Sequence, residues 1–141
     1  MEARPDLAAM MGPIGRTLVA MELPILRAHG VSMWGYAVLS NLDDQPVHTQ
    51  TALAEAIGAD KTRLIAVLDD LQSAGLIERR PAPGDRRARV LSITPEGRRL
   101  RDAVQSEIRD EEERILDVLP PDQRAVFVDA LRTLSAAAKR P

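Results

Sequence analysis

The chain contains no cysteine and very few aromatic or histidine residues among its 141 positions. Without cysteine it can form no disulfide, no thiolate metal site and no thiol redox switch. Its two histidines, His29 and His48, lie in different segments, which disfavours a structural zinc site. Trp34, Tyr36 and Phe127 are the only aromatic residues, so the core and any subunit interface must be largely aliphatic.

Long apolar runs are also missing. No stretch of about 18 consecutive apolar residues exists, so the sequence predicts no membrane span. The first residues, MEARPDLAAMM, include an acid at position 2 and no extended apolar segment, which is not typical of a secretion signal. We therefore expect a cytoplasmic protein, and its length predicts one domain-sized unit with a real core.

The sequence lacks the residue sets that catalysis requires. No Ser/His/Asp set, Cys/His pair, paired carboxylate motif or glycine-rich phosphate loop stands out. We therefore expect neither an enzyme nor a bound cofactor or metal.

The stretch from Thr49 to Thr94 predicts two short helices followed by a β-ribbon. In the first helix Thr49 is an N-cap and Gly58 the end, with an apolar face at Leu53, Ala56 and Ile57. Asp60 caps the second helix, whose inward face comprises Leu64, Val67, Leu68 and Leu71. This order is typical of a DNA-binding helix-turn-helix, although an ordinary αα-hairpin in a helical bundle remains an alternative.

The ribbon that follows favours the DNA-binding alternative. Strands are predicted over 76–80 and 89–93, with turn residues at Pro81, Pro83, Gly84 and Asp85. Residues 79–89 carry five arginines against one acid. Like charges packed on one small hairpin repel each other, so this tip is expected to face a polyanion.

The distribution of charge points the same way, although the chain has a net charge of −2. Residues 61–101 contain ten basic and five acidic residues, which leaves +5 there and −7 elsewhere. A basic reading head on an acidic body directs DNA to one face of the molecule.

The two ends of the chain predict amphipathic helices. In the N-terminal one, apolar residues recur at close to heptad spacing: Leu7, Met11, Ile14, Leu18, Met21 and Ile25. Thr94 and Pro95 start a long helix, Pro120-Pro121 ends it, and a last helix carries Phe127, Leu131 and Leu134 on one face. These faces indicate a dimer interface, with packing inside one chain as the simpler alternative.

These residues together resemble the MarR family of bacterial transcriptional regulators. The family's wing pattern D-x-R-x-x-x-L-x-L-T is met by Asp85, Arg87, Leu91 and Thr94, with Ile93 in place of the second leucine. Before the wing, the family has the pattern L-A-x-x-x-G…D-K-x-R-L…L-x-x-x-G-L-[IV]-x-R. This chain meets it with Leu53-Ala54, Gly58, Asp60-Lys61, Arg63-Leu64, Leu71, Gly75-Leu76-Ile77 and Arg79. Many members carry a basic residue where this chain has Ala66 and Asp70, so its operator cannot be taken from relatives.

The resemblance implies a mainly α fold with a small β-wing: a winged helix-turn-helix over about 31–94, flanked by dimerisation helices over about 5–29 and 95–138. It implies a homodimeric regulator on a pseudo-palindromic double-stranded operator, most simply a repressor. The residues expected to contact DNA are Thr49, Gln50, Thr51, Lys61, Thr62, Arg63, Ile65, Ala66, Arg79, Arg86, Arg87 and Arg89. Arg87 is expected in the minor groove, oriented by Asp85.

The resemblance also implies a cleft for a small aromatic or phenolic effector. His29, Met33, Trp34 and Tyr36 are the residues expected to line it, with core packing and a surface histidine as the alternative. A winged helix that binds a protein partner in place of DNA is the alternative function.

Overall fold

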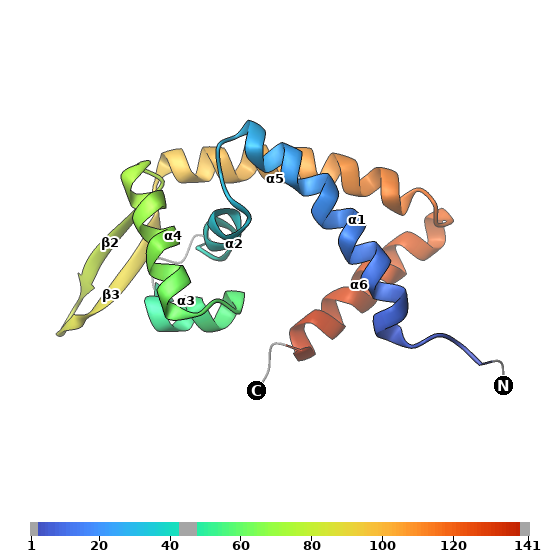
Figure 1. The fold of residues 1–141 in the computed structure, drawn as a ribbon, viewed down its shortest axis with the longest axis horizontal. Coiled ribbons are helices and arrows are strands. Elements are labelled where there is room, and N and C mark those ends of the chain that lie inside the picture. The colour runs from blue at the N-terminus through green and yellow to red at the C-terminus, as the bar shows by residue number, and fades with distance from the viewer. Residues whose placement is uncertain (1–2, 43–47, 139–141) are drawn as a thin grey trace.

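The chain is described by a computed structural model over residues 3–42 and 48–138. In chain order the elements are α1 (Leu7–Ala28), α2 (Met33–Asn41), β1 (His48–Thr49), α3 (Gln50–Ile57), α4 (Lys61–Ser73), β2 (Ile77–Ala82), β3 (Asp85–Ile93), α5 (Pro95–Leu116) and α6 (Pro121–Ala138). Figure 1 shows two parts joined by α5. We call the part from α2 to β3 the head, and α1, α5 and α6 together the frame.

The helix starts in the head follow from their capping residues, as the sequence predicted. The hydroxyl of Thr49 accepts a hydrogen bond from the Ala52 N–H at 3.1 Å, and a carboxylate oxygen of Asp60 accepts one from the Arg63 N–H at 2.7 Å. Between the two helices, Gly58 ends α3 in the left-handed conformation, with φ of 71°. Because glycine has no Cβ, this tight turn carries no steric penalty.

The β-ribbon is longer than predicted. Strands were expected over 76–80 and 89–93, but β2 reaches Ala82 and β3 begins at Asp85, so only Pro83 and Gly84 remain in the turn. Pro81 was assigned to the turn because it lacks a backbone donor. It fits in a strand because β2 is an edge strand and the register shifts between Pro81 and Ala82.

A third strand was not predicted. His48 pairs with Leu91 and Thr49 with Val90, which places β1 on the other side of β3 in the order β1-β3-β2. Two residues carry no detectable alternation of apolar and polar side chains, so β1 exists only because α3 begins beside β3.

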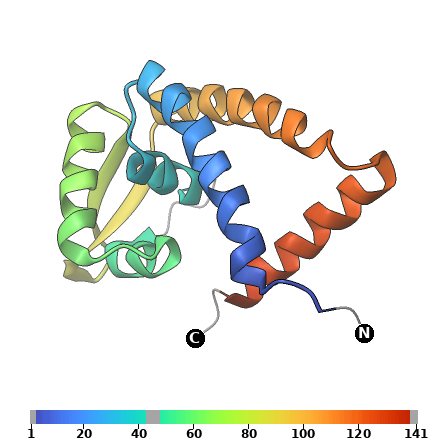
Figure 2. The same ribbon diagram turned by 45° about the vertical axis from the view of Figure 1, so that its right-hand side comes forward.

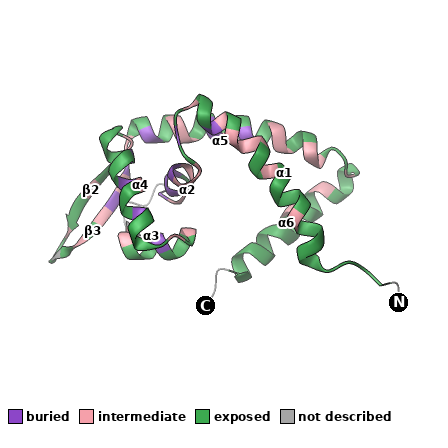
Figure 3. Ribbon diagram, in the orientation of Figure 1, coloured by how far each residue is buried: buried purple, intermediate pink, exposed green. Residues whose placement is uncertain are grey.

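The buried core lies in the head and at its junction with α1 and α5 (Figure 3). Leu39, Leu53, Leu68 and Leu91 from four different elements are fully enclosed, and Val104 of α5 joins them. The half of the frame that lies farther from the head has far less burial. Among its described residues α6 has none that is buried, and Figures 1 and 2 both show it crossing the N-terminal half of α1.

Large apolar side chains are exposed where α1 and α6 cross. Leu7, Met11 and Ile14 of α1 face Phe127 and Leu131 of α6 across a groove of about 320 Å³. A monomer gains nothing from exposing a contiguous apolar surface. Within residues 3–42 and 48–138, no helix is both long enough and apolar enough to cross a membrane.

Candidate nucleic-acid interface

The first turn of α4 is exposed and follows a capped helix N-terminus. Lys61, Thr62 and Arg63 are all exposed, as predicted, and Ile65 shows 47% of its surface. Ala66 is exposed as well, whereas Leu64 and Leu68 anchor the opposite face in the core. A helix presented in this way offers its exposed side chains to a groove and the positive end of its dipole to a phosphate.

The wing carries its arginines beside this helix. Arg87 and Arg89 are both exposed and lie two residues apart on β3, at the irregularity where Arg89 pairs with Pro81 and Asp85 pairs with Ala82. A carboxylate oxygen of Asp85 accepts a hydrogen bond from the backbone N–H of Arg87 at 2.9 Å. The contact that the structure shows between the two residues is with the backbone of Arg87, so the orientation of the Arg87 guanidinium by Asp85 stays a prediction. The side chain of Arg86 lies outside the described part of the chain.

Arg79 faces the body of α4. Its Nε donates to the amide oxygen of Gln72 at 2.5 Å, and its guanidinium forms an ion pair with Asp69 at 2.5 Å. Only 20% of the Arg79 side chain is exposed. This contact joins β2 to α4 and thus helps to set the spacing between that helix and the wing.

Four side chains from four elements line a polar hollow between α3, α4 and the wing. Its volume is about 390 Å³ and its walls are Gln50, Gln72, Arg79 and Arg89. Gln50 is the first residue of α3, so the N-terminal end of that helix lies at the wall of the hollow. Because Arg79 is already paired with Asp69, the groups that favour an oxyanion here are the Arg89 guanidinium, the side-chain amides and the helix N-terminus.

Arg63 has an unexpected neighbour. Its guanidinium carbon lies 5.7 Å from the centre of the Trp34 ring, which is a cation–π contact. Trp34 was expected to line an effector cleft. The structure places its ring beside the first turn of α4, and its role in an effector cleft stays a prediction.

The other three expected effector residues also have separate surroundings. Nε2 of His29 lies 2.6 Å from a carboxylate oxygen of Glu107 on α5. Met33 packs against the core. Burial raises the pKa of the Tyr36 hydroxyl, the hydrogen bond with Ser40 opposes this shift, and the charge of Glu22 adds to it.

Glu22 gives the junction between α1, α2 and α5 a pH dependence. Burial, and secondarily the charge of Glu112, raises the pKa of the Glu22 carboxyl. The protonated carboxyl group therefore adds to the free energy of unfolding at acidic pH. This contribution is lost as the pH rises through the pKa of Glu22 in the folded protein. We expect Glu22→Gln to raise the free energy of unfolding at pH 7.5, by roughly 0.5 kcal/mol or less because the side chain is only half-buried. Urea unfolding at pH 7.5 and pH 4 checks this, since the gain should vanish at pH 4.

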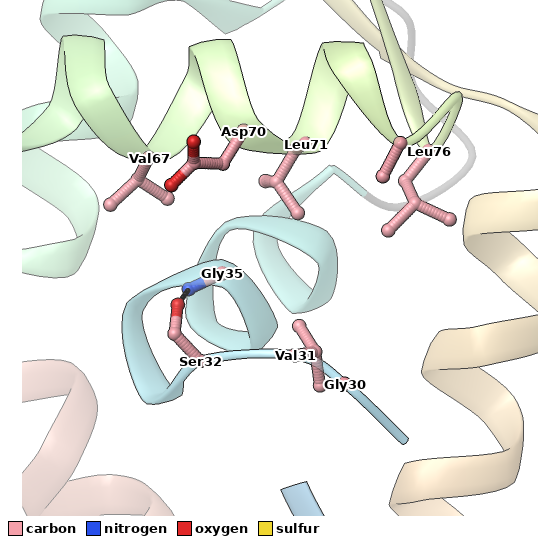
Figure 4. A pocket seen from close by; sticks show the side chains of 9 residues that line it. Gly30, Val31, Ser32, Gly35, Val67, Asp70, Leu71 and Leu76 are labelled. Carbon is pink, nitrogen blue, oxygen red and sulfur yellow. Dashed lines mark hydrogen bonds between the residues drawn. The ribbon is translucent and has the colours of Figure 1, made fainter. Parts of the chain in front are cut away.

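A separate cavity of about 300 Å³ lies between the start of α2 and the C-terminal half of α4 (Figure 4). The carboxylate of Asp70 points from α4 toward the first turn of α2, where the Ser32 hydroxyl accepts a hydrogen bond from Gly35. A carboxylate near a helix N-terminus is favourable. His29, Met33, Trp34 and Tyr36 lie outside the wall of this cavity.

Sequence reasoning missed Asp69 and Gln72. The charge of Asp69 is matched by Arg79, and the side-chain oxygen of Gln72 accepts a hydrogen bond from the same guanidinium group. The available signal was their spacing of three residues, which puts both on one face of α4 next to the strand that returns after Gly75. Among the described residues, no group of three or more metal-ligating side chains gathers around a common point.

Comparison with known proteins agrees with this arrangement. The model of the MarR family matches residues 31–88, which run from the start of α2 into β3. A protein of Thauera aromatica that is described as a regulator of the hcr operon is 31% identical over 114 residues. The match covers 78% of this chain and 66% of the Thauera protein, so this chain spans about two thirds of that relative's length.

Solved structures of regulators share the whole fold. CouR from Rhodococcus jostii RHA1, bound to a 23-mer DNA duplex, is 25% identical with a TM-score of 0.81 over 92% of both chains. PcaV from Streptomyces coelicolor, in complex with its natural ligand, is 28% identical with a TM-score of 0.70 over 97% of this chain and 99% of PcaV. The motifs, the winged helix-turn-helix and these likenesses show that the chain belongs to the MarR family of transcriptional regulators.

Proposed function

We propose that this protein is a homodimeric, sequence-specific reader of double-stranded DNA that represses a nearby promoter. The observation that carries the proposal is the pairing of an exposed, capped first turn of α4 with an arginine-bearing face of the wing beside it. A helix of this kind fits the major groove, and an arginine on a ribbon tip fits a narrow minor groove. The DNA-bound structure of the related CouR supports this reading.

The polar hollow fits between these two contacts. When α4 lies in the major groove and the wing in the adjacent minor groove, the sugar–phosphate strand that separates the grooves must cross the gap between them. The hollow of Gln50, Gln72, Arg79 and Arg89 lies in that gap. We propose that it holds a backbone phosphate, which positions the head without reading sequence.

Arg89 offers a test of this phosphate contact. Arg89→Ala is expected to reduce the slope of log K against log salt concentration by about 0.9 per head, or about 1.8 for a dimer. Titration of a labelled duplex at several salt concentrations measures the slope. Arg132→Ala removes the same charge from α6, where Arg132 pairs with Asp129 at 3.3 Å, and it should leave the slope unchanged. Equal slopes for all three proteins would place Arg89 outside the interface.

A dimer provides the second head. The exposed apolar groove between α1 and α6 supports the proposal that a second copy covers it, because such a surface stays buried in a stable assembly. A two-fold dimer places its recognition helices in successive major grooves, with half-sites about 10 bp apart in a pseudo-palindrome.

Leu131→Glu tests the dimer. Leu131 lines the groove and is 40% exposed in the single chain. A charge there would have to be buried without a partner, so we expect a monomer in sedimentation equilibrium at micromolar concentration. Thr133→Glu adds the same charge on another face of α6 and should remain dimeric. A Leu131→Glu protein that remained dimeric would show that the interface lies elsewhere.

We also propose that a small aromatic or phenolic effector releases the DNA. The structure of PcaV with its natural ligand supports a ligand-responsive regulator, although His29, Met33, Trp34 and Tyr36 face different neighbours in this chain. Only a ligand that binds two head spacings unequally can shift the DNA equilibrium. Unchanged DNA affinity across a panel of phenolic and aromatic acids would contradict this part.

Selection of bound duplexes from a random pool at about 0.1 M salt tests the function itself. We expect enrichment of a two-fold symmetric site with half-sites one helical turn apart. The folded dimer enriching no sequence, with or without the effector panel, would contradict sequence-specific DNA binding.

A further inference from the structure

The contact between Trp34 and Arg63 joins two helices with different expected roles. Trp34 is the second residue of α2, inside the head, whereas Arg63 is the third residue of α4. The Trp34 ring is half-buried and the Arg63 side chain is exposed, and the guanidinium carbon lies 5.7 Å from the ring centre. The backbone of Arg63 is held as well, because its N–H donates to Asp60 at 2.7 Å. Arg63 is therefore held at both its backbone and its charged end.

A guanidinium group can stack and donate hydrogen bonds at the same time. Its face lies against the aromatic ring, while its five N–H donors lie in its own plane and remain available to an acceptor. A free arginine side chain loses considerable rotamer entropy when it binds a partner. An arginine already held on a ring has lost part of that entropy before binding, so its contact with a partner is stronger.

We infer that Trp34 is a positioning residue for DNA recognition, which holds the Arg63 guanidinium ready to bind the duplex from the first turn of α4. The inference rests on the proposed DNA-binding function. Trp34 acts through Arg63 and needs no contact with the duplex. A ligand that moved α2 relative to α4 would alter this contact, so the pair also connects the interior of the head to the DNA surface.

A double-mutant cycle on DNA affinity tests the inference. The probe is the duplex enriched from the random pool by the wild-type protein, and the variants are Trp34→Leu, Arg63→Ala and the double variant. Loss of a cation–π contact predicts that Trp34→Leu weakens binding about two- to fivefold per head, or roughly 4- to 25-fold for the dimer. In the Arg63→Ala background the same change should alter affinity by less than about twofold, because the partner is gone.

A purely structural role for Trp34 predicts a different pattern. It would weaken binding equally whether or not Arg63 is present. The control cycle uses Lys61→Ala, which removes a charge from the same turn of α4 and should be additive with Trp34→Leu. Trp34→Phe should restore part of the affinity, because phenylalanine keeps an aromatic face. Thermal melting of each variant checks that the head is folded, and Trp34→Met, which also lacks an aromatic ring, replaces Trp34→Leu in the cycle if the latter does not fold.

A second readout needs no DNA. In the NMR spectrum of the free protein, the Arg63 Nε–H signal should be shifted by the ring current of Trp34. The shift should be smaller in Trp34→Phe and should disappear in Trp34→Leu. Assignment comes from the loss of that signal in Arg63→Lys. An unshifted Arg63 signal in the wild-type protein overturns the inference.

The outcomes separate the inference from the proposed function. If the wild-type protein binds no duplex, the proposed function fails and the inference fails with it. If the wild-type protein binds and the two changes are additive, only the inference fails. Tighter binding by Trp34→Leu also overturns it, because Trp34 would then compete with DNA for Arg63.

Discussion

Arg87→Ala is expected to weaken binding to the operator by about 10-fold per head and about 100-fold for the dimer. One specific arginine contact in a groove is worth roughly 1–3 kcal/mol, and a dimer makes two of them. Arg87 is exposed near the tip of the wing, and its backbone N–H donates a hydrogen bond to the Asp85 carboxylate at 2.9 Å. Fluorescence anisotropy with the selected duplex at fixed salt measures the loss.

Arg80 provides the matched control for Arg87. It carries the same charge on the same ribbon, but it lies opposite Val90 in the regular part of the ladder, on the face of β2 opposite Arg79, and its guanidinium pairs with Glu78 at 2.9 Å. Arg80→Ala should change affinity by less than about threefold, as expected for the loss of one distant charge. Similar losses in the two variants would show that the wing acts only through its net charge, and that no arginine enters the groove.

Asp85→Ala would show how the wing arginine is oriented. The Asp85 carboxylate holds the backbone of the turn at Arg87, so its loss should make the tip less ordered while leaving the guanidinium intact. We expect Asp85→Ala to weaken DNA binding less than Arg87→Ala does. The slope of log K against log salt concentration should stay unchanged, because every arginine of the wing is still present.

Gly97→Ala is expected to lower the free energy of unfolding by about 3 kcal/mol, which corresponds to a fall of about 10 °C in the melting temperature. A Cβ at Gly97 would lie 2.1 Å from the Leu76 carbonyl oxygen and 2.8 Å from a side-chain carbon of Ile93. The first of these neighbours is backbone, and its oxygen already accepts a hydrogen bond from the Thr94 N–H. The clash therefore cannot be relieved by a side-chain rotation.

The position of Gly97 gives this change a functional consequence. Gly97 lies in the first turn of α5, where the Thr94 hydroxyl accepts from the Gly97 N–H at 3.0 Å and donates to the Gly75 carbonyl at 2.7 Å. This turn is where the head joins the frame. Displacing it should alter the spacing of the two heads, so DNA affinity should fall even in protein that remains folded.

Gly12→Ala controls for the loss of a glycine. A Cβ there would meet only the flexible end of Arg16, at 3.3 Å, and alanine is favoured over glycine within a helix. It should leave stability unchanged or raise it by up to about 1 kcal/mol. Urea unfolding at one protein concentration compares the variants, because the stability of a dimer depends on concentration. A Gly97→Ala protein as stable as Gly12→Ala would show that the junction is loosely packed.

The sequence by itself determined the elements whose signals are local. Asp60 and Thr94 predicted helix starts because a side-chain oxygen can reach an unpaired N–H three residues later, and both hydrogen bonds are present. Gly58 predicted the turn because only glycine adopts a left-handed conformation there without strain. The excess of arginine over 79–89 predicted the basic tip, since charge is read directly from composition.

Only the tertiary structure decided which of these charged groups are available and where the strands end. From the sequence, Arg63 and Arg79 were both expected to contact DNA. In the structure Arg79 is bound to Asp69 and Gln72, whereas Arg63 lies against Trp34. These partners come from other elements, and their distances depend on packing that no local pattern encodes. The strand β1 and the extension of β2 through Pro81 likewise arose from pairing with β3, because backbone hydrogen bonds between distant segments outweigh weak local preferences.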